Sequence, residues 1–216
     1  AILTTQALAA RITALVREFG WWHIPVLTVK ERPDSACRET AESMLKNIQP
    51  RSPAIIQYTS GSTSQPKGVV LSHHNLVNNA RGMQAHGTFD STSVGFSWLP
   101  PYHDMGLISG LTLPVCVGYH SVLCAPSRFL SRPAFWLESI DRFGATITGG
   151  PNFAFDLCVD KIKDQEIEGI SLSSLKAVFN GAEPVRSFTL ARFAARFKSV
   201  GFNPDSFSPV YGLAET

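Results

Sequence analysis

The chain has 216 residues, of which 44% are hydrophobic and 17% are charged, and its formal net charge is +2 at pH 7. This composition excludes an intrinsically disordered chain and is sufficient for a hydrophobic core. The charge is nearly balanced and no Lys/Arg run exceeds two residues. Nothing in the composition therefore indicates a nucleic acid as partner.

In chain order, the hydrophobic patterns alternate between helix and strand. Residues 5–19 are predicted as a helix, 25–29 as a strand, 31–52 as a polar connection, 54–58 and 69–71 as strands, and 75–85 as a helix. A strand at 94–99, a helix within 106–117 and a strand at 121–125 follow. The last elements are a helix from Pro133 to Gly144, strands at 145–148, 177–179 and 210–211, and helices at 152–163 and 188–197. This alternation predicts a layered α/β fold with mostly parallel sheets flanked by helices, and ligands at the carboxyl ends of the strands.

Residues 105–127 contain no Asp, Glu, Lys or Arg, which is long enough to span a bilayer. Their glycines, Pro114 and His120 favour a buried helix followed by a buried strand, so we expect no membrane span. The cysteines form neither a CxxC pair nor a disulfide framework, which predicts free thiols in a reducing compartment. They are Cys37, Cys116, Cys124 and Cys158.

Residues 58–68 read Tyr-Thr-Ser-Gly-Ser-Thr-Ser-Gln-Pro-Lys-Gly and follow an apolar strand. The hydroxyl groups are donors that suit phosphate oxygens, Gly61 lets the backbone approach a ligand, and Lys67 adds a positive charge. The segment is not a P-loop, because Lys67 precedes Gly68 where a P-loop has Ser or Thr. Composition alone is also compatible with a Ser/Thr/Gly turn between two strands.

The residue order favours the phosphate-binding interpretation, because Thr-Ser-Gly-Ser-Thr-x-x-Pro-Lys-Gly resembles the phosphate loop of the adenylate-forming superfamily. Three further segments, at 98–107, 180–184 and 211–216, resemble segments of that superfamily in the expected order. Residues 99–108, 149–158 and 180–186 are most similar to fatty acyl-AMP ligases. The resemblance implies that residues 1–216 are part of an N-terminal adenylation domain and lack the mobile C-terminal domain.

The resemblance also implies roles for individual residues. His103 would orient the acyl carboxylate, although a structural imidazole is an equal alternative, and the apolar candidates could equally be core residues. The implied catalytic residues are Lys67, Glu215 and His103, with Glu215 also as the Mg²⁺ ligand. The implied ATP/AMP-binding residues are Thr59, Ser60, Gly61, Ser62, Thr63, Lys67, Asn180, Gly181, Ala182, Glu183, Tyr211, Gly212, Leu213, Ala214 and Glu215. The implied acyl-binding residues are His103, Met105, Leu111, Val115, Gly149 and Pro151.

The expected function is ATP-dependent activation of a fatty acid to acyl-AMP, followed by transfer to the phosphopantetheine thiol of an acyl carrier protein. ATP and Mg²⁺ are the expected cofactors, and the cytoplasm is the expected location. An acyl-CoA synthetase that uses coenzyme A is one alternative, and a nucleotide-binding module without catalysis is another. We expect residues 1–216 alone to be inactive, because the resemblance assigns further catalytic groups to other segments.

Overall fold

The computed structural model describes residues 2–4, 6–21, 23–24, 26–28, 43, 45–59 and 67–213. The chain divides into two compact units, Ala1–Gln49 and Pro50–Thr216. In the first unit, β1 (Ile2–Thr4) pairs in parallel with β2 (Val26–Thr28) across the helix α1 (Gln6–Glu18). The predicted helix and strand are confirmed here, whereas β1 was not predicted. Most of the connection expected at 31–52 lies outside the described residues.

The second unit begins with an antiparallel pair, β3 (Pro53–Thr59) and β4 (Lys67–Ser72), followed by α3 (His73–His86). All three elements were predicted, with shorter bounds. The helix starts at a reciprocal cap: the Asn75 N–H donates to Ser72 Oγ (3.2 Å), and the Ser72 N–H donates to Asn75 Oδ1 (3.0 Å). This cap fixes the direction in which α3 leaves the hairpin.

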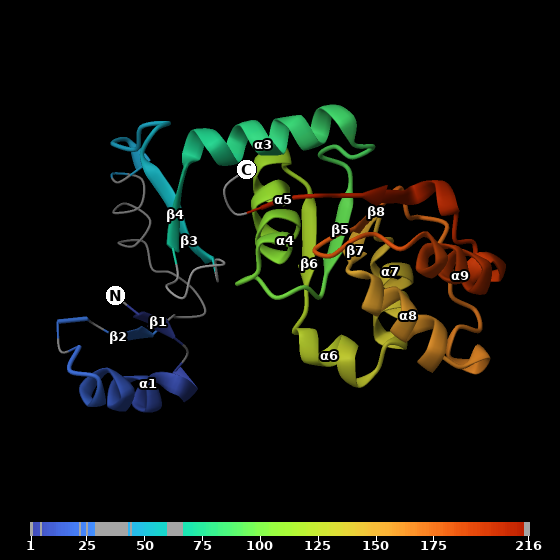
Figure 1. Ribbon diagram of the computed structural model, residues 1–216, viewed down its shortest axis with the longest axis horizontal. Helices are drawn as coiled ribbons and strands as arrows, with labels where there is room; N and C mark the ends of the chain where they lie inside the picture. Colours follow the sequence, from blue (N-terminus) through green and yellow to red (C-terminus); the bar gives the residue numbers. More distant parts are fainter. Residues whose placement is uncertain are drawn as a thin grey trace. The chain divides into compact units, whose positions relative to one another are not determined.

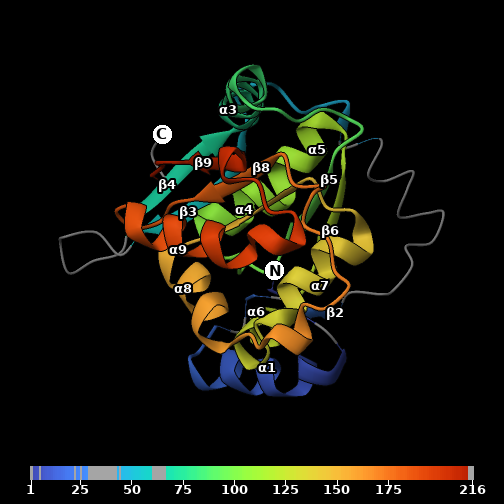
Figure 2. The same ribbon diagram turned by 90° about the vertical axis from the view of Figure 1, so that its right-hand side faces the viewer.

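A five-stranded parallel sheet forms the centre of the second unit, in the order β6-β5-β7-β8-β9 (Figures 1 and 2). It confirms the predicted α/β class with mostly parallel strands. The strands are β5 (Val94–Ser97), β6 (His120–Leu123), β7 (Ile147–Gly150), β8 (Ala177–Asn180) and β9 (Phe207–Pro209).

The strand predicted at 210–211 was wrong, because the last strand, β9, ends at Pro209. The ring of Phe207 packs against Phe155 and Phe202, with centroid separations of 5.5 and 5.1 Å. These contacts with the core fix the strand at Phe207–Pro209, before the predicted position. The misplaced strand matters, because Tyr211 is thereby released from the sheet.

Helices cover both faces of the sheet. On one face lie α3, α4 (Asp104–Leu107), a π-helix (Ile108–Thr112) and α5 (Leu113–Val117), and on the other lie α7 (Ala134–Phe143), α8 (Asn152–Lys161) and α9 (Ser187–Phe197) (Figure 1). Adjacent strand residues serve opposite faces: Ile147 packs in the α3 and α5 cluster, whereas Thr148 Oγ1 accepts the Trp136 indole N–H from α7 (2.8 Å). A short helix, α6 (Pro126–Ser131), was not predicted.

The apolar stretch at 105–127 forms helical turns followed by β6, so the predicted order of helix and strand is confirmed. The predicted burial of the strand is wrong, because β6 lies at the edge of the sheet and Leu123 is 52% exposed. Among the helices that the structure describes, none has the length and apolar character needed to cross a membrane. Cys116, Cys124 and Cys158 are free thiols, while Cys37 lies outside the described residues.

Candidate active site

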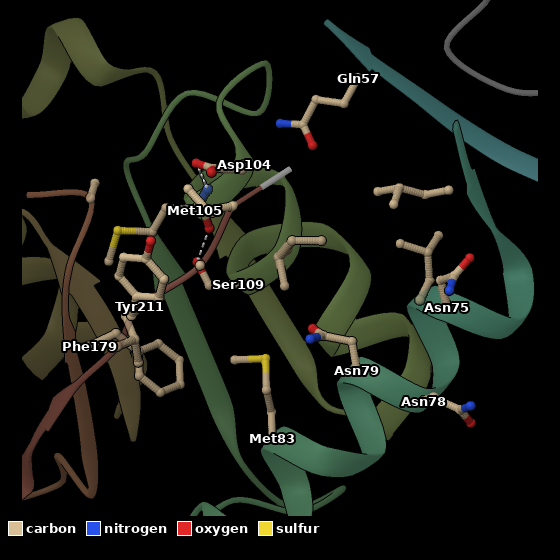
Figure 3. Close-up of a pocket in the computed structure, with 17 residues that line it drawn as sticks. Gln57, Asn75, Asn78, Asn79, Met83, Asp104, Met105, Ser109, Phe179 and Tyr211 are labelled. Carbon is tan, nitrogen blue, oxygen red and sulfur yellow. Dashed lines mark hydrogen bonds between the residues drawn. The ribbon is translucent and has the colours of Figure 1, made fainter. Parts of the chain in front are cut away.

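A cavity of about 530 Å³ lies within the second unit, beyond the carboxyl ends of β8 and β9 (Figure 3). Its lining comes from β3, β4, α3, α4, the π-helix, β8, the turn after β8 and the chain after β9. This is the edge at which parallel α/β sheets bind ligands. The lining residues are Gln57, Leu71, Asn75, Leu76, Asn78, Asn79, Met83, Asp104, Met105, Ile108, Ser109, Phe179, Ala182, Val210, Tyr211, Gly212 and Leu213.

The turn that follows β8 carries four of the predicted nucleotide-binding residues. Asn180 is fully buried, and its Nδ2 donates to the Gly150 carbonyl oxygen (3.1 Å), while its Oδ1 has no hydrogen-bond partner among the described residues. Ala182 lines the cavity with a positive φ of 66°, a conformation that costs free energy for a residue with a Cβ atom. A Cβ atom on Gly181 would lie 2.6 Å from the Val210 carbonyl oxygen, so the turn packs directly on the chain after β9.

This turn is held against the start of α8 by a buried amide. Asn152, which is 1% exposed, donates from Nδ2 to the Pro184 carbonyl oxygen (2.9 Å) and accepts the Arg186 N–H at Oδ1 (3.0 Å). The Glu183 carboxylate accepts the Phe153 N–H (3.4 Å), so it faces the helix terminus and does not line the cavity. Glu183 was predicted to bind the nucleotide, but in this structure its carboxylate binds the start of α8.

The segment after β9 provides an open aromatic face. Tyr211 is 87% exposed and lines the cavity together with Gly212 and Leu213. Figure 3 shows its ring beside Met105 and Phe179. A phenol ring that is exposed on this scale offers its face to a flat ligand such as a purine.

His103 and Asp104 meet at the start of α4. His103 Nδ1 lies 2.6 Å from Asp104 Oδ1, and the Met105 N–H donates to Asp104 Oδ1 (2.6 Å) and to His103 Nδ1 (3.3 Å). Asp104 and Met105 line the cavity, whereas His103 lies outside its lining with a side chain that is 52% exposed. The imidazole is therefore a helix-capping group one residue from the cavity wall.

A single helix was predicted within 106–117, and the structure instead inserts a π-helix between α4 and α5. The wider turn leaves backbone carbonyl groups that side chains satisfy. Tyr119 OH donates to the backbone carbonyl oxygen of Ser109 (3.5 Å), and Ser121 Oγ donates to that of Gly110 (2.9 Å). Burial raises the pKa of Tyr119 well above its ordinary value, which keeps the phenol a donor. The π-helix presents Ile108 and Ser109 to the cavity.

The six acyl-binding candidates divide into two groups. Met105 lines the large cavity, and Gly149 lines a second cavity of about 10 Å³. His103, Leu111, Val115 and Pro151 line neither cavity, and Val115 is 83% exposed.

Several predicted residues fall outside the described part of the chain: Ser60, Gly61, Ser62, Thr63, Ala214 and Glu215. Lys67 starts β4 with an exposed side chain, and the backbone of Thr59 ends β3; residues 60–66 between them lie outside the described part of the chain. Within the described residues, no group of three His, Cys, Asp or Glu side chains could hold a metal ion. The predicted Mg²⁺ ligand Glu215 is not among them.

The cavity also contains residues that the sequence had not indicated. Gln57, Asn79 and Met83 point toward it in Figure 3, and Phe179 closes its side toward the sheet. Asn79 and Met83 are spaced by four residues, so a helical projection would have placed them on one face of α3. No feature of the sequence indicated that this face of α3 lies opposite the segments that follow β8 and β9.

Comparison with known proteins agrees with this arrangement. A model of the AMP-binding enzyme family matches residues 9–216. The chain is 44% identical over 169 residues to the medium-chain-fatty-acid–[acyl-carrier-protein] ligase TtuA of Teredinibacter turnerae, covering 78% of this chain and 26% of the relative. It is 35% identical over 220 residues to the putative fatty-acid–CoA ligase fadD21 of Mycobacterium leprae, covering 99% of this chain and 38% of the relative.

Solved structures show the same likeness. A fatty acyl-adenylate ligase from L. pneumophila, in complex with acyl adenylate and pyrophosphate, superposes with a TM-score of 0.80 at 41% identity, over 88% of this chain and 33% of that one. A fatty acyl-adenylate ligase from a study of the E. coli and L. pneumophila enzymes superposes with a TM-score of 0.85 at 30% identity, over 99% of this chain and 38% of that one. The chain thus spans between about a quarter and two fifths of the length of these relatives. It belongs to the family of AMP-binding enzymes and is similar to its fatty acyl-AMP ligases.

Proposed function

We propose that this chain is part of the N-terminal adenylation domain of a fatty acyl-AMP ligase, which activates a fatty acid with ATP and releases pyrophosphate. One observation carries the proposal: a single cavity of about 530 Å³ is lined both by an open aromatic ring and by apolar side chains. The ring is that of Tyr211, and the apolar wall includes Met83, Met105 and Phe179. An acyl adenylate has two parts that suit such a lining, a flat polar base and an alkyl chain.

The exposed ring of Tyr211 suits adenine, because it provides a stacking surface at the cavity. Asn180 is fully buried and lies outside the lining, so it would act on the nucleotide by positioning the turn after β8 through its hydrogen bond to the Gly150 carbonyl oxygen. Gly181, Ala182, Gly212 and Leu213 would then contact the base and sugar through the backbone, and Glu183 would hold the turn against α8.

The phosphates are assigned to Lys67 and to residues 59–63. In the proposed reaction a carboxylate oxygen of the fatty acid attacks the α-phosphorus of ATP, the bond from that phosphorus to the bridging oxygen breaks, and pyrophosphate leaves with the electron pair. The cation Lys67 and the donors of Thr59, Ser60, Gly61, Ser62 and Thr63 would stabilise the charge on the leaving group. Glu215, with Ala214 beside it, would hold Mg²⁺, which neutralises triphosphate oxygens when it is bound.

The acyl side is assigned to the apolar wall. Met105 contacts the alkyl chain in this proposal, and His103, one residue outside the lining, orients the carboxylate through the start of α4. Gly149 borders the small cavity behind the wall, and the remaining candidates, Leu111, Val115 and Pro151, would support the wall from outside the lining.

The second step would transfer the acyl group to the phosphopantetheine thiol of an acyl carrier protein, as the name of the Teredinibacter relative states for that protein. Coenzyme A is the alternative acceptor, as the name of the mycobacterial relative states. We propose a cytoplasmic location, where ATP and reduced thiols are available. The mobile C-terminal domain would be supplied by the longer polypeptide, so residues 1–216 alone would be inactive.

The test uses that longer polypeptide with ATP, a fatty acid and hydroxylamine. Formation of acyl hydroxamate with an equal amount of pyrophosphate is expected. ATP binding without hydroxamate, across straight-chain acids of different lengths, would instead identify a nucleotide-binding module without catalysis. Parallel reactions with holo-carrier protein and with coenzyme A, analysed for thioester by mass spectrometry, distinguish the two acceptors.

A further inference from the structure

The large cavity and the small cavity are separated by a shared wall. Ser109 and Phe179 are the residues that line both, among those that the structure describes. The small cavity lies between the sheet and the π-helix, since its other lining residues come from β5, β6 and β7 and from Leu99. Its volume of about 10 Å³ holds about one water molecule and no alkyl chain.

The wall is held in place from both sides. Ser109 Oγ donates to the Met105 carbonyl oxygen (2.5 Å), which keeps the serine side chain against its own helix. Phe179 is 6% exposed and packs edge-to-face on Phe89, with ring centroids 6.1 Å apart. Both side chains therefore have a defined position, and the boundary between the cavities depends on their size.

Gly110 shows how closely the π-helix approaches the sheet behind this wall. A Cβ atom at Gly110 would lie 3.2 Å from Ser97 Oγ and 3.5 Å from a Leu123 methyl carbon. The π-helix therefore lies close to the sheet here, which leaves little space beyond the wall. Removing atoms from the wall would join this space to the large cavity, and adding atoms would shorten the large cavity.

We propose that Ser109 and Phe179 set the greatest length of acyl chain that the site accepts. The inference depends on the proposed function and adds a specificity determinant to it. The alkyl chain passes Met105 and ends against the side chains of Ser109 and Phe179. When one methylene group no longer fits an apolar pocket, the ratio of kcat/KM between two acids changes by about 10-fold or more. The wall would therefore limit the length of the acyl chain sharply.

The test measures kcat/KM for adenylate formation by the longer polypeptide with straight-chain acids from hexanoic to hexadecanoic. The value for octanoic acid is compared with the value for the first acid longer than the one at the maximum of the wild-type profile. Phe179→Leu should raise the ratio of kcat/KM for the longer acid to kcat/KM for octanoic acid by about 10-fold. Phe197→Leu is the matched control, because Phe197 is completely buried, belongs to the other core cluster and lines neither cavity. It should lower stability while leaving that ratio within about 2-fold of wild type.

Ser109→Leu gives the opposite change and keeps the inference testable if Phe179→Leu does not fold. It should move the maximum of the profile toward shorter acids. Unchanged chain-length ratios in the folded variants, with an active wild-type enzyme, would overturn this inference and leave the proposed function intact. A wild-type enzyme that forms no acyl adenylate with any acid would overturn both.

Discussion

The side-chain amide of Asn152 donates to the carbonyl oxygen of Pro184 at 2.9 Å, which joins the first residue of α8 to the turn after β8. The same amide accepts the Arg186 N–H at 3.0 Å. Two segments about thirty residues apart are thus held by one buried side chain that has both a donor and an acceptor. The position of the turn at the cavity follows from this contact, more than from the local sequence of the turn.

Replacing Asn152 with Ala should therefore destabilise the protein and loosen the turn. It removes two hydrogen bonds made by a buried side chain, which should lower the free energy of unfolding by about 1–3 kcal/mol. Urea unfolding followed by circular dichroism measures this change. Gln84→Ala, on the exposed surface of α3, is the control and should change stability by less than about 0.5 kcal/mol. Equal stability of the two variants would contradict the structural role of Asn152.

Arg192 links α8 and α9, and its loss should have a smaller effect. Its guanidinium contacts Asp156 Oδ1 (3.0 Å) and Asp160 Oδ1 (2.6 Å), while Asp156 also accepts from Thr189 Oγ1 (3.0 Å). All three charged side chains are partly exposed, so Arg192→Gln should cost about 1 kcal/mol in low salt. Added salt should reduce the difference from wild type, because it screens the ion pairs.

The control for this prediction is Arg81→Gln, since Arg81 is exposed on α3 and makes no ion pair within the described residues. Thermal unfolding at low and high ionic strength measures both variants. A destabilisation by Arg192→Gln that does not depend on salt would show that packing of the arginine stem, and not its charge, joins the two helices.

Much of the fold could be predicted because hydrophobic periodicity reports which faces are buried. The strands of the five-stranded sheet were predicted in this way, and only the last one was misplaced, where the partly buried ring of Phe207 lies between two serines. The π-helix could not be predicted, because side chains such as Ser121 satisfy its free carbonyl groups. These side chains reach the carbonyl groups only once β6 lies beside the helix. Lining residues such as Gln57 were missed for the same reason, since they meet the site only through tertiary packing.

The three described cysteines should differ in reactivity. Cys116 is exposed, whereas Cys158 is completely buried, and burial raises the pKa of its thiol well above the ordinary value of 9.0. At pH 8, iodoacetamide should alkylate Cys116 in the native protein and Cys158 only after unfolding. Peptide mass spectrometry over time measures both rates. Alkylation of native Cys158 at the rate of Cys116 would contradict the burial.

The same shift predicts a dependence of stability on pH. The thiol of Cys158 loses its proton more readily in the unfolded state, so the unfolded state binds fewer protons above the ordinary pKa of 9.0. The free energy of unfolding should therefore fall as the pH rises through 9.0. Cys158→Ala should remove part of this slope, and an unchanged slope in a folded variant would argue against the burial as its cause.

The central proposal is that the cavity beside Tyr211 binds an acyl adenylate. Titration calorimetry of the longer polypeptide with a non-hydrolysable acyl sulfamoyl adenosine tests this binding directly. Tyr211 and Tyr102 are 87% and 86% exposed, but only Tyr211 lines the cavity. We predict that Tyr211→Ala weakens binding by about 10-fold through lost stacking, with Tyr211→Phe and Tyr102→Ala close to wild type. Equal affinities of the Tyr211→Ala and Tyr102→Ala variants would contradict the assignment of this cavity.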